Sequence, residues 1–552
     1  MQSSDKELVQ MVVAALAHHG VRRVIHSPGS RNSSFAIAFE AHPDIETLVV
    51  HDERAAAFIA LGWAQQTQTP VALCCTSGSA CLNYYPAIAE AYYRNIPLLV
   101  LTADRPAKWI NQGDGQTIVQ AEVFNNHTHA YLGFDEDNFT VSPTSIEQIH
   151  HFLQHLQQPW KGPIHLNIGL NEPLYGFTEM QHFDFPKIFN ATHSESLPDF
   201  SVLKDKKIMV LVGQMDPDPA LELQLSLFAK FSNVVVLVEN TSNLQNERFN
   251  TCIDRSLNSI DNSDIMYQPE VLISFGGAIV SKRIKAYLRE TPLHLHWRLA
   301  SDFPDMNTFG VLSACLPIHP VLFFKELLSA GLELNSLNFQ GKWKALDYIA
   351  KDRQAEFQTN AGQIYDYHVF AALQEVLSAP CILHLANSSV VRYAQLFNPI
   401  EGVHYYSNRG TSGIDGSVST AVGAALASPN QQHLLVCGDT SFIYDSNALW
   451  TEPFPKNLKI IMIQNHGGGI FQIIQGPATS PLRAQYFEAT HQKSPGKIAE
   501  GYGFEVQYCV EQQELIPTLV SFLENDHQLL EIQTHQDGNA QVLQDFFNFV
   551  KK

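Results

Sequence analysis

Short apolar runs that alternate with helical patterns along the whole chain constrain its fold most strongly. Each run is a nearly continuous stretch of β-branched and other apolar residues, such as VRRVIHSPG (21–29), KIMVLVG (207–213) and HLLVCGD (433–439). Strands of this kind are buried on both faces, as in a parallel sheet covered by helices. The runs fall into three blocks, so we predict three doubly wound α/β domains.

The positions of the runs set the expected domain boundaries. The predicted strands are 21–29, 47–53, 70–78, 96–104 and 163–168 in the first block, 207–213, 234–240, 271–277 and 293–297 in the second, and 381–387, 403–408, 433–439, 458–466 and 529–534 in the third. Segments 173–205 and 335–360 read as linkers. A chain of 552 residues agrees with domains of roughly 100–200 residues each. We therefore expect domains at 1–185, 186–345 and 346–552.

The charge and the first residues limit the expected partners and location. The net charge is −20 without a run of Lys and Arg, so nucleic-acid binding, which depends on clustered cations, is not expected. The segment MQSSDKELVQMVVAALAHHG reads as an amphipathic helix capped by Ser4 or Asp5, not as a signal peptide. Since no stretch approaches the apolar length of a membrane span, we expect a cytoplasmic protein.

Cysteine and histidine show no metal-binding pattern. The eight cysteines are scattered without a C-x-x-C pair, and several lie inside apolar runs, so we expect reduced cysteines in protein cores. The 24 histidines are not arranged at the spacings of metal sites. His18 and His19 are expected to be solvated on a helix.

Two strand ends in the third block carry an oxygen-ligand pair. Asp439 ends one strand and Asn465 ends a later one, with a helical segment between them. Ligands bind beyond the carboxyl ends of parallel strands, and Mg²⁺ prefers oxygen ligands shared with phosphates. The glycine run 467–469 permits a main-chain carbonyl to approach a ligand closely, and a helix starting near Thr440 offers N–H groups to a phosphate. The alternative is two ordinary strand-to-helix turns, with Asp439 as a helix cap.

The pair GD…QNHGGG resembles the GDG…NN signature of thiamine diphosphate enzymes. It departs from that signature at Thr440 and at Gln464. The resemblance implies a thiamine diphosphate-binding fold, with a pyrimidine-binding domain at 1–185, a central domain at 186–345 and a diphosphate-binding domain at 346–552. It also implies that Asp439, Asn465 and the Gly467 carbonyl hold Mg²⁺ or Mn²⁺ beside the diphosphate.

Enzymes of that superfamily need a carboxylate against the aminopyrimidine of the cofactor, and Glu53 in TLVVHDERAAAF is the candidate. It lies where a predicted strand ends and a helix begins. The alternative is a first-turn acid favoured only by the helix dipole. A cofactor held by the third block and activated by the first implies that the two blocks meet. In this superfamily they usually meet across a subunit interface, so the resemblance implies a homodimer or homotetramer.

Further motifs narrow the resemblance. They are SPGSRNSSF (27–35), GDGQTI (113–118), SKR (281–283), NSSVVR (387–392) and NRGTSGIDG (408–416). Together they resemble the 2-succinyl-5-enolpyruvyl-6-hydroxy-3-cyclohexene-1-carboxylate synthase family of menaquinone biosynthesis. That resemblance implies a transferase that decarboxylates 2-oxoglutarate and adds the succinyl-semialdehyde unit to isochorismate.

Both of these substrates are dicarboxylates, and cations stand at the motif positions. The cations are Arg31, Lys282, Arg283, Arg392 and Arg409. Arg suits bidentate carboxylate binding, and Lys supplies a point charge. Each of them could instead be a surface residue or part of a structural ion pair.

The resemblance assigns further roles to apolar and polar residues of these motifs. Ile414 is expected to support the bent form of the cofactor, and Ile470 and Phe471 to wall the substrate pocket. The polar residues expected to contact substrate or the reacting centre are Ser30, Gln116 and Ser388. Core packing, loop hydrogen bonding and helix capping are the alternatives for these positions.

Three other functions stay open. A different 2-oxo acid carboligase, such as an acetolactate synthase-like enzyme, is disfavoured by the cations suited to dicarboxylates. A non-catalytic scaffold would not need Glu53, Asp439 and Asn465 together. A NAD or FAD enzyme would need a G-x-G-x-x-G motif after the first strand, which the sequence lacks, and we expect the central block to bind no FAD.

Overall fold

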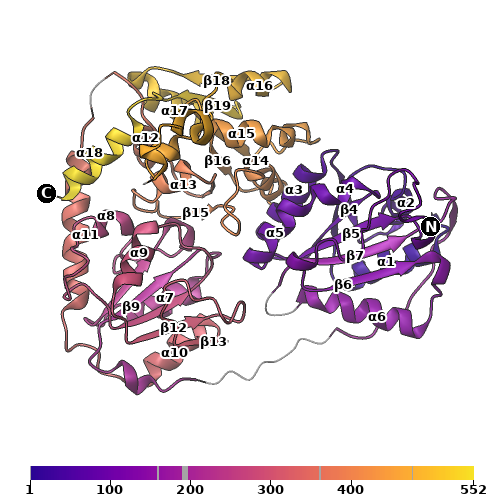
Figure 1. Cartoon of the computed structure of the whole chain (residues 1–552), viewed down its shortest axis with the longest axis horizontal. Helices are drawn as coiled ribbons and strands as arrows, with labels where there is room; N and C mark the ends of the chain where they lie inside the picture. Colours follow the sequence, from indigo (N-terminus) through magenta and orange to yellow (C-terminus); the bar gives the residue numbers. More distant parts are fainter. Residues whose placement is uncertain (1, 158–160, 189–196, 360–361, 475, 552) are drawn as a thin grey trace. The chain divides into compact units, whose positions relative to one another are not determined.

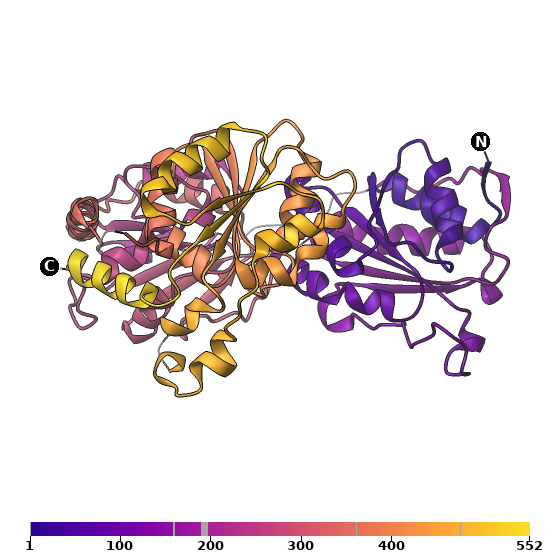
Figure 2. The same cartoon turned by 90° about the horizontal axis from the view of Figure 1, so that it is seen from above.

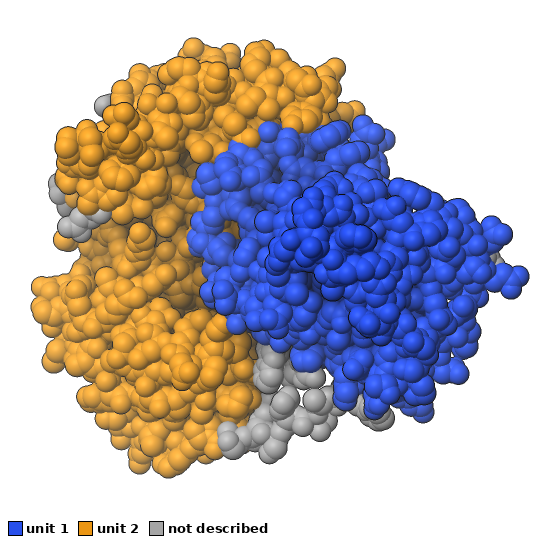
Figure 3. Space-filling model, turned by 45° about the vertical axis from the view of Figure 1, so that its right-hand side comes forward, with its two compact units in different colours: residues 1–192, 410–432, 444–458 blue, residues 193–409, 433–443, 459–552 orange. Residues whose placement is uncertain are grey.

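The structure, a computed structural model, describes residues 2–157, 161–188, 197–359, 362–474 and 476–551. Three parallel β-sheets have helices on both faces (Figures 1 and 2), which confirms the three α/β domains predicted from the apolar runs. The chain divides into two compact units (Figure 3). Unit 1 comprises residues 1–192, 410–432 and 444–458, and unit 2 comprises residues 193–409, 433–443 and 459–552.

Unit 1 is built on a sheet with strand order β3-β2-β4-β5-β7-β6, beside a small β1-β8 sheet. Its strands are β1 (Gln2–Ser4), β2 (Arg23–His26), β3 (Glu46–Val49), β4 (Val71–Cys75), β5 (Leu98–Asp104), β6 (Tyr131–Asp135), β7 (Ile164–Gly169) and β8 (Phe177–Glu179). Its helices are α1 (Glu7–His18), α2 (Ser33–Ala41), α3 (Glu53–Thr67), α4 (Ser79–Asn83), α5 (Tyr85–Arg94), α6 (Pro143–Leu153) and α14 (Ser417–Ala427).

Helices α3 and α14 pack backbone to backbone through two glycines. A Cβ atom on Gly62 would lie 2.0 Å from the Thr420 carbonyl oxygen, and one on Gly423 would lie 2.0 Å from the Ile59 carbonyl oxygen. Only glycine permits such an approach. This close packing fixes the position of α3, the helix whose first turn contains Glu53.

Unit 2 contains two sheets, ordered β10-β9-β11-β12-β13 and β15-β14-β16-β17-β19-β18. The strands are β9 (Ile208–Val212), β10 (Val234–Val238), β11 (Val271–Phe275), β12 (Leu295–Leu299), β13 (Ala314–Leu316), β14 (Cys381–Leu385), β15 (Val403–Tyr406), β16 (His433–Gly438), β17 (Leu458–Gln464), β18 (Val506–Cys509) and β19 (Leu529–Gln533). The helices are α7 (Pro219–Phe228), α8 (Ile253–Leu257), α9 (Lys282–Glu290), α10 (Pro320–Ser329), α11 (Phe339–Glu356), α12 (Asp366–Val376), α13 (Ser389–Ala394), α15 (Asp439–Tyr444), α16 (Pro495–Gly501), α17 (Leu515–Glu524) and α18 (Asn539–Lys551).

The strand β9 shows why these runs are apolar throughout. Ile208, Val210 and Val212 join one buried cluster, and Met209 and Leu211 join another on the opposite face. Because successive side chains of a strand point to opposite faces, a sheet with two covered faces needs apolar residues at every position.

Several sequence predictions of local structure were wrong. The expected linker 335–360 contains helix α11, whose Phe339, Trp343 and Ala350 are buried at helical spacing. The expected linker 173–205 contains β8, which pairs with β1 and so places Ser4 in a strand. Helix α1 therefore begins at Glu7 after Lys6, with no side-chain cap from Ser4 or Asp5.

The prediction for the cysteines was confirmed, whereas the prediction for His18 and His19 was correct for only one of them. Every cysteine is a free thiol and, apart from the half-buried Cys315, is buried, which confirms that expectation. His18 is exposed, but His19 is fully buried, so the prediction of a solvated pair was wrong for His19. No helix among the described residues is both long enough and apolar enough to cross a membrane.

Candidate functional site

The predicted metal ligands lie together at the carboxyl ends of two neighbouring strands in unit 2. Asp439 follows β16 and opens α15, and Asn465 follows β17. The Gly467 N–H donates to Asp439 Oδ2 at 3.1 Å, which joins the two strand ends. Asp439 and Asn465 are 1% and 8% exposed. The expected juxtaposition of a carboxylate and an amide is therefore present.

Asp439 is a buried carboxylate surrounded by groups that favour its charged form. Burial raises the pKa of Asp439, while His491 and the N–H groups of Thr440 and Gly467 act in the opposite direction. His491 Nε2 lies 3.7 Å from Asp439 Oδ2. A divalent cation at this carboxylate would offset the cost of burying its charge.

The loop after Asn465 depends on glycine. Gly467 has φ +143°, and a Cβ atom there would lie 2.7 Å from the Glu488 carbonyl oxygen. The Gly467 carbonyl accepts from the Gly469 N–H at 2.9 Å and keeps a second lone pair for a ligand.

The Asn465 amide has an oxygen that fits a metal. Asn465 Oδ1 is buried and has no hydrogen-bond partner among the described residues, whereas its Nδ2 donates to Asp366 Oδ2 at 3.1 Å. A buried, unpartnered amide oxygen is costly unless a ligand occupies it. With the Asp439 carboxylate and the Gly467 carbonyl, it gives an all-oxygen donor set of the type that Mg²⁺ prefers.

Asp366 and His491 were missed by the sequence reasoning. Asp366 opens α12 and also accepts hydrogen bonds from Thr534 and Asn539. Burial raises the pKa of Asp366 to about 6, against hydrogen bonds from Thr534 and Asn465. Neither residue lies in a recognisable motif, so only the fold shows their connection to the predicted metal ligands.

A cavity of about 590 Å³ in unit 2 gathers several of the predicted substrate residues. Its lining includes Lys282, Arg283, Arg392 and Ile470. Ile470 belongs to a short helical turn (Gly469–Gln472) that continues the metal-site loop, so the cavity wall and the proposed metal ligands share one stretch of chain.

The cations reach the cavity from α9 and α13. Lys282 and Arg283 are exposed at the start of α9, and the Arg283 guanidinium lies 4.0 Å from the centre of the Phe547 ring. Arg392 on α13 donates to the Ser388 carbonyl, and burial and the neighbouring Arg409 lower its pKa. Their grouping makes this cavity suited to a ligand with carboxylates.

Two buried acids hold the start of α9 in place. The Glu239 carboxylate accepts from the Val280 and Ser281 N–H groups, each at 2.7 Å. Asp254 accepts from the Ser281 hydroxyl. Burial raises the pKa of Glu239 to about 7, against those two N–H donors. Glu239 directly follows strand β10. Its position at a strand end could have identified it from the sequence as a candidate site residue.

The remaining predicted substrate residues of unit 2 are Arg409, Ser388 and Phe471, and they lie close to the residues that line the cavity. Arg409 is 6% exposed and donates to Asn387 Oδ1 at 2.8 Å. Ser388 has φ +73° and precedes α13 without a side-chain cap. Phe471 is half-buried, with its ring 6.0 Å from that of Phe487.

In unit 1, Glu53 occupies the first turn of α3 and is half-buried. Its Oε2 accepts from Asn83 Nδ2 at 3.3 Å. Asp52 caps the helix, since its Oδ1 accepts from the Ala55 N–H at 3.1 Å. The capping role therefore falls to Asp52 and leaves the Glu53 carboxyl available for another contact.

The glycine loops of unit 1 meet at the carboxyl ends of β2 and β4. A Cβ atom on Gly29 would lie 2.3 Å from Thr76 Cβ, and one on Gly78 would lie 3.3 Å from the Gln116 backbone. Gln116 is an exposed residue with φ +55°. Ser30 is exposed beside Gly29. The motifs SPGSR, TSGS and GDGQTI thus form one loop cluster.

Arg31 is bound inside unit 1. It is 3% exposed, and its guanidinium donates to the Leu170 carbonyl at 3.0 Å and to Glu172 at 3.2 Å. These contacts fit the structural ion pair that was the alternative for this residue, and its predicted substrate role stays a prediction.

The loop that carries Ile414 is anchored to α5. The fully buried Glu90 accepts from the Gly410 and Thr411 N–H groups at 2.8 and 2.7 Å. A Cβ atom on Gly416 would lie 2.2 Å from the Phe58 ring. Between these anchors, Ile414 is 38% exposed, and its predicted contact with the cofactor stays a prediction.

Family models match each of the three domains. The model "Thiamine pyrophosphate enzyme, N-terminal TPP binding domain" matches residues 6–125, "Middle domain of thiamine pyrophosphate" matches 186–308, and "Thiamine pyrophosphate enzyme, C-terminal TPP binding domain" matches 388–531.

Curated relatives match over nearly the whole chain. The chain is 39% identical over 549 residues to the 2-succinyl-5-enolpyruvyl-6-hydroxy-3-cyclohexene-1-carboxylate synthase of Flavobacterium psychrophilum, with 98% of each chain covered. The enzyme of the same name from Flavobacterium johnsoniae is 41% identical over 511 residues, with 90% of each covered. That from Porphyromonas gingivalis is 34% identical over 569 residues, covering 99% of this chain and 98% of the relative.

Proposed function

Because the chain belongs to the thiamine pyrophosphate-dependent 2-succinyl-5-enolpyruvyl-6-hydroxy-3-cyclohexene-1-carboxylate synthase family, we propose that it decarboxylates 2-oxoglutarate and adds the succinyl-semialdehyde unit to isochorismate. It is a carbon–carbon bond-forming transferase of menaquinone biosynthesis, with thiamine diphosphate as cofactor. This family membership favours the synthase over an acetolactate synthase-like carboligase.

Asp439, Asn465 and the Gly467 carbonyl are proposed to hold the divalent metal, Mg²⁺ or Mn²⁺. The unpartnered Asn465 oxygen supports this assignment. Bound thiamine diphosphate supplies an electron sink for decarboxylation, and the protein supplies binding and orientation. Ile414 is proposed to support the cofactor ring from the loop held by Glu90.

Glu53 is proposed as the catalytic carboxylate that shares a proton with N1′ of the cofactor. Its Asn83 contact orients one carboxyl oxygen, and it lies in the first turn of α3, which packs closely against α14. A general acid–base group must lie within hydrogen-bond reach of the proton it exchanges. The proposal therefore requires Glu53 and the metal ligands to serve the same cofactor.

The proposed substrate class rests on the cations that line the cavity. Lys282, Arg283 and Arg392 line one cavity walled by Ile470, whose turn continues from the proposed metal ligands. This single observation supports binding of dicarboxylates next to a metal-held cofactor. Further substrate contacts are proposed for Ser30, Arg31, Gln116, Ser388, Arg409 and Phe471.

A homo-oligomer, dimer or tetramer, is proposed because enzymes of this superfamily usually bring the block with the activating glutamate and the block with the metal ligands together across a subunit interface. Location in the cytoplasm, where 2-oxoglutarate and isochorismate would be its small-molecule partners, is also proposed.

Release of CO₂ tests substrate choice. The protein loaded with thiamine diphosphate and Mg²⁺ is incubated with 2-oxoglutarate or pyruvate, each with and without isochorismate. We expect CO₂ from 2-oxoglutarate, at a higher rate when isochorismate is present. Preferential release from pyruvate would contradict the proposed function.

A further inference from the structure

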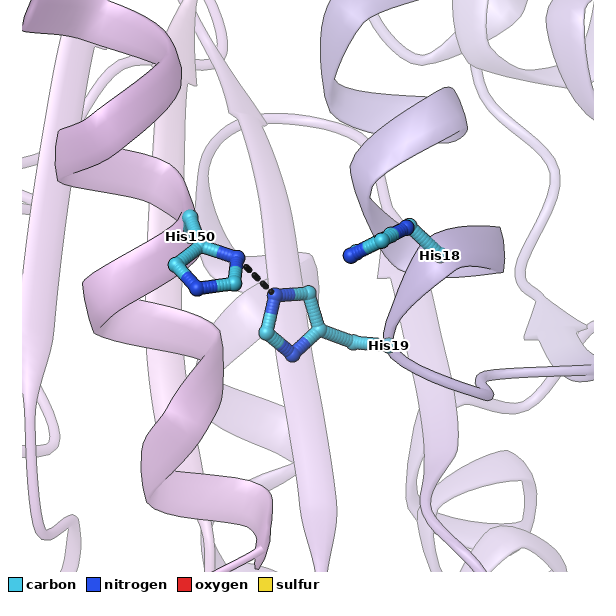
Figure 4. Close-up of side chains that lie close together, drawn as sticks. All are labelled: His18, His19 and His150. Atoms are coloured by element: carbon cyan, nitrogen blue, oxygen red, sulfur yellow. Dashed lines mark hydrogen bonds between the residues drawn. The ribbon is translucent and has the colours of Figure 1, made fainter. Parts of the chain in front are cut away.

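Three histidines of unit 1 lie together, and none of them belongs to a motif that the proposed function uses. His18 and His19 come from the end of α1, and His150 comes from α6 (Figure 4). One possible ligand nitrogen from each lies within 4.8 Å of the others. Among the described residues, no other group of three His, Cys, Asp or Glu side chains is gathered in this way.

The two buried histidines already have nearly the spacing of metal ligands. His19 Nε2 lies 3.0 Å from His150 Nδ1, and the two residues are 0% and 4% exposed. In a tetrahedral zinc site, two imidazole nitrogens lie about 3.3 Å apart, given the usual Zn–N bond length. A metal could therefore take the place of this hydrogen bond once both rings turn their lone pairs toward it and the proton between them moves to the other nitrogen of its own ring.

These rings are in the form that binds a metal. Burial, and then the neighbouring His150 and His18, lower the pKa of His19 to about 3. Burial also lowers the pKa of His150. Metal binding requires neutral imidazole, so neither ring has to lose a proton to solution at neutral pH.

The third histidine lies at the surface. His18 is exposed and lines a cavity of about 410 Å³. Its ring stacks on Phe185, with centroids 5.3 Å apart, and its Nε2 lies 2.9 Å from the Pro186 carbonyl oxygen. His150 Nε2 lies 3.0 Å from the Gln154 amide nitrogen, which donates to it. A ligating imidazole instead donates its second N–H to an outer acceptor, so metal binding would require the Gln154 amide to turn its oxygen toward His150 Nε2.

We propose that His18, His19 and His150 form a zinc site that joins α1 to α6, with water in the fourth position. Nitrogen donors select Zn²⁺ and related transition metals over Mg²⁺. The site would therefore remain separate from the all-oxygen donor set of Asp439 and Asn465. Bound metal would stabilise unit 1, since an ion that binds only the folded state shifts the folding equilibrium.

The test uses the full chain without a polyhistidine tag, loaded with thiamine diphosphate and excess Mg²⁺. Zn²⁺ is titrated by calorimetry, and Co²⁺ by visible absorption, because tetrahedral Co²⁺ absorbs far more strongly than octahedral Co²⁺. We expect one Zn²⁺ per chain and an intense Co²⁺ band. His18→Ala, at an exposed position that should not disturb folding, should weaken Zn²⁺ binding at least tenfold and abolish the band.

Two further variants complete the design. His151→Ala removes an exposed histidine of the same helix outside the trio and should leave Zn²⁺ binding unchanged. His150→Gln should also abolish the Co²⁺ band. Equal Zn²⁺ affinity in wild type and His18→Ala, or no Zn²⁺ bound by the wild type, would overturn the proposal and reduce the trio to a hydrogen-bonded pair beside a surface histidine.

Discussion

The amide of Asn465 donates to the buried carboxylate of Asp366, with Nδ2 3.1 Å from Oδ2. Because a carboxylate only accepts, this contact fixes the amide nitrogen toward α12 and leaves Asn465 Oδ1 for a ligand. Asp366 is therefore a positioning residue for the proposed metal ligand.

Asp366→Asn should weaken Mg²⁺ binding. An amide at position 366 can either donate or accept, so Asn465 loses its fixed orientation. Loss of such an outer contact typically costs about 10–100-fold in metal affinity. Thermal-shift titration with Mg²⁺ in the presence of thiamine diphosphate measures the change.

The matched control is Thr534→Val. It removes a different hydrogen bond to the same carboxylate, at 2.7 Å, and leaves the Asn465 contact intact. We expect a stability loss of about 1 kcal/mol with unchanged Mg²⁺ affinity. An equal loss of affinity in both variants would mean that Asp366 acts through stability alone.

Glu53→Gln should abolish turnover while the fold and thiamine diphosphate binding persist. The amide keeps the size of the side chain but cannot exchange the proton. Turnover, circular dichroism and cofactor titration are compared with those of Glu40→Gln, a change at an exposed position. Normal turnover in Glu53→Gln would remove Glu53 from the mechanism.

Mixing two inactive variants tests the proposed assembly. Chains with Glu53→Gln and chains with Asp439→Asn are each expected to be inactive. If each site takes Glu53 from one subunit and the metal ligands from another, mixed oligomers contain some sites with no substitution, and activity returns. Absence of recovery, with subunit exchange verified, would place both residues of a site in one chain.

Glu239 should make stability depend on pH. Burial raises the pKa of Glu239 from 4.5 to about 7, so the folded state holds this proton more tightly than the unfolded state. Its stabilising contribution is complete below pH 4.5 and is lost as pH rises through 7.

Denaturant unfolding at several pH values measures this contribution. Between pH 5 and 8, the wild type should lose roughly 1–3 kcal/mol more than Glu239→Gln. Glu247→Gln, at a side chain that is 78% exposed, should follow the wild type. Identical pH profiles for wild type and Glu239→Gln would show that Glu239 does not titrate in this range.

Arg392→Ala should raise KM for the dicarboxylate substrates. The guanidinium lines the cavity together with Lys282 and Arg283, and a charge-assisted hydrogen bond is worth about 1.5–3 kcal/mol. We expect KM to rise roughly 10–100-fold, with partial recovery in Arg392→Lys. Lys230→Ala, at an exposed position, is the control, and an unchanged KM in Arg392→Ala would remove Arg392 from the substrate site.

The apolar runs predicted the interior strands of all three sheets but missed one edge strand in each. The missed strands β6, β13 and β18 lie at sheet edges. Their residues are mostly half-buried. Each of these three strands has a neighbour on one side only and lacks a long continuous apolar sequence, so it gives no strong signal.

Motifs identified the proposed metal ligands, which follow strand ends, and the cavity cations, which lie on the helices that follow β11 and β14. They could not show Asp366 or the link between His19 and His150, because each joins positions far apart in the sequence. Such contacts depend on how helices pack, for which local spacing carries no information. The domain boundaries at 185/186 and 345/346 stay predictions.

Mass spectrometry of the product tests the proposed reaction most directly. With thiamine diphosphate, Mg²⁺, 2-oxoglutarate and isochorismate, we predict CO₂ and one product whose mass is the sum of isochorismate and succinic semialdehyde. Free succinic semialdehyde with unchanged isochorismate, or an adduct formed only from pyruvate, would contradict it.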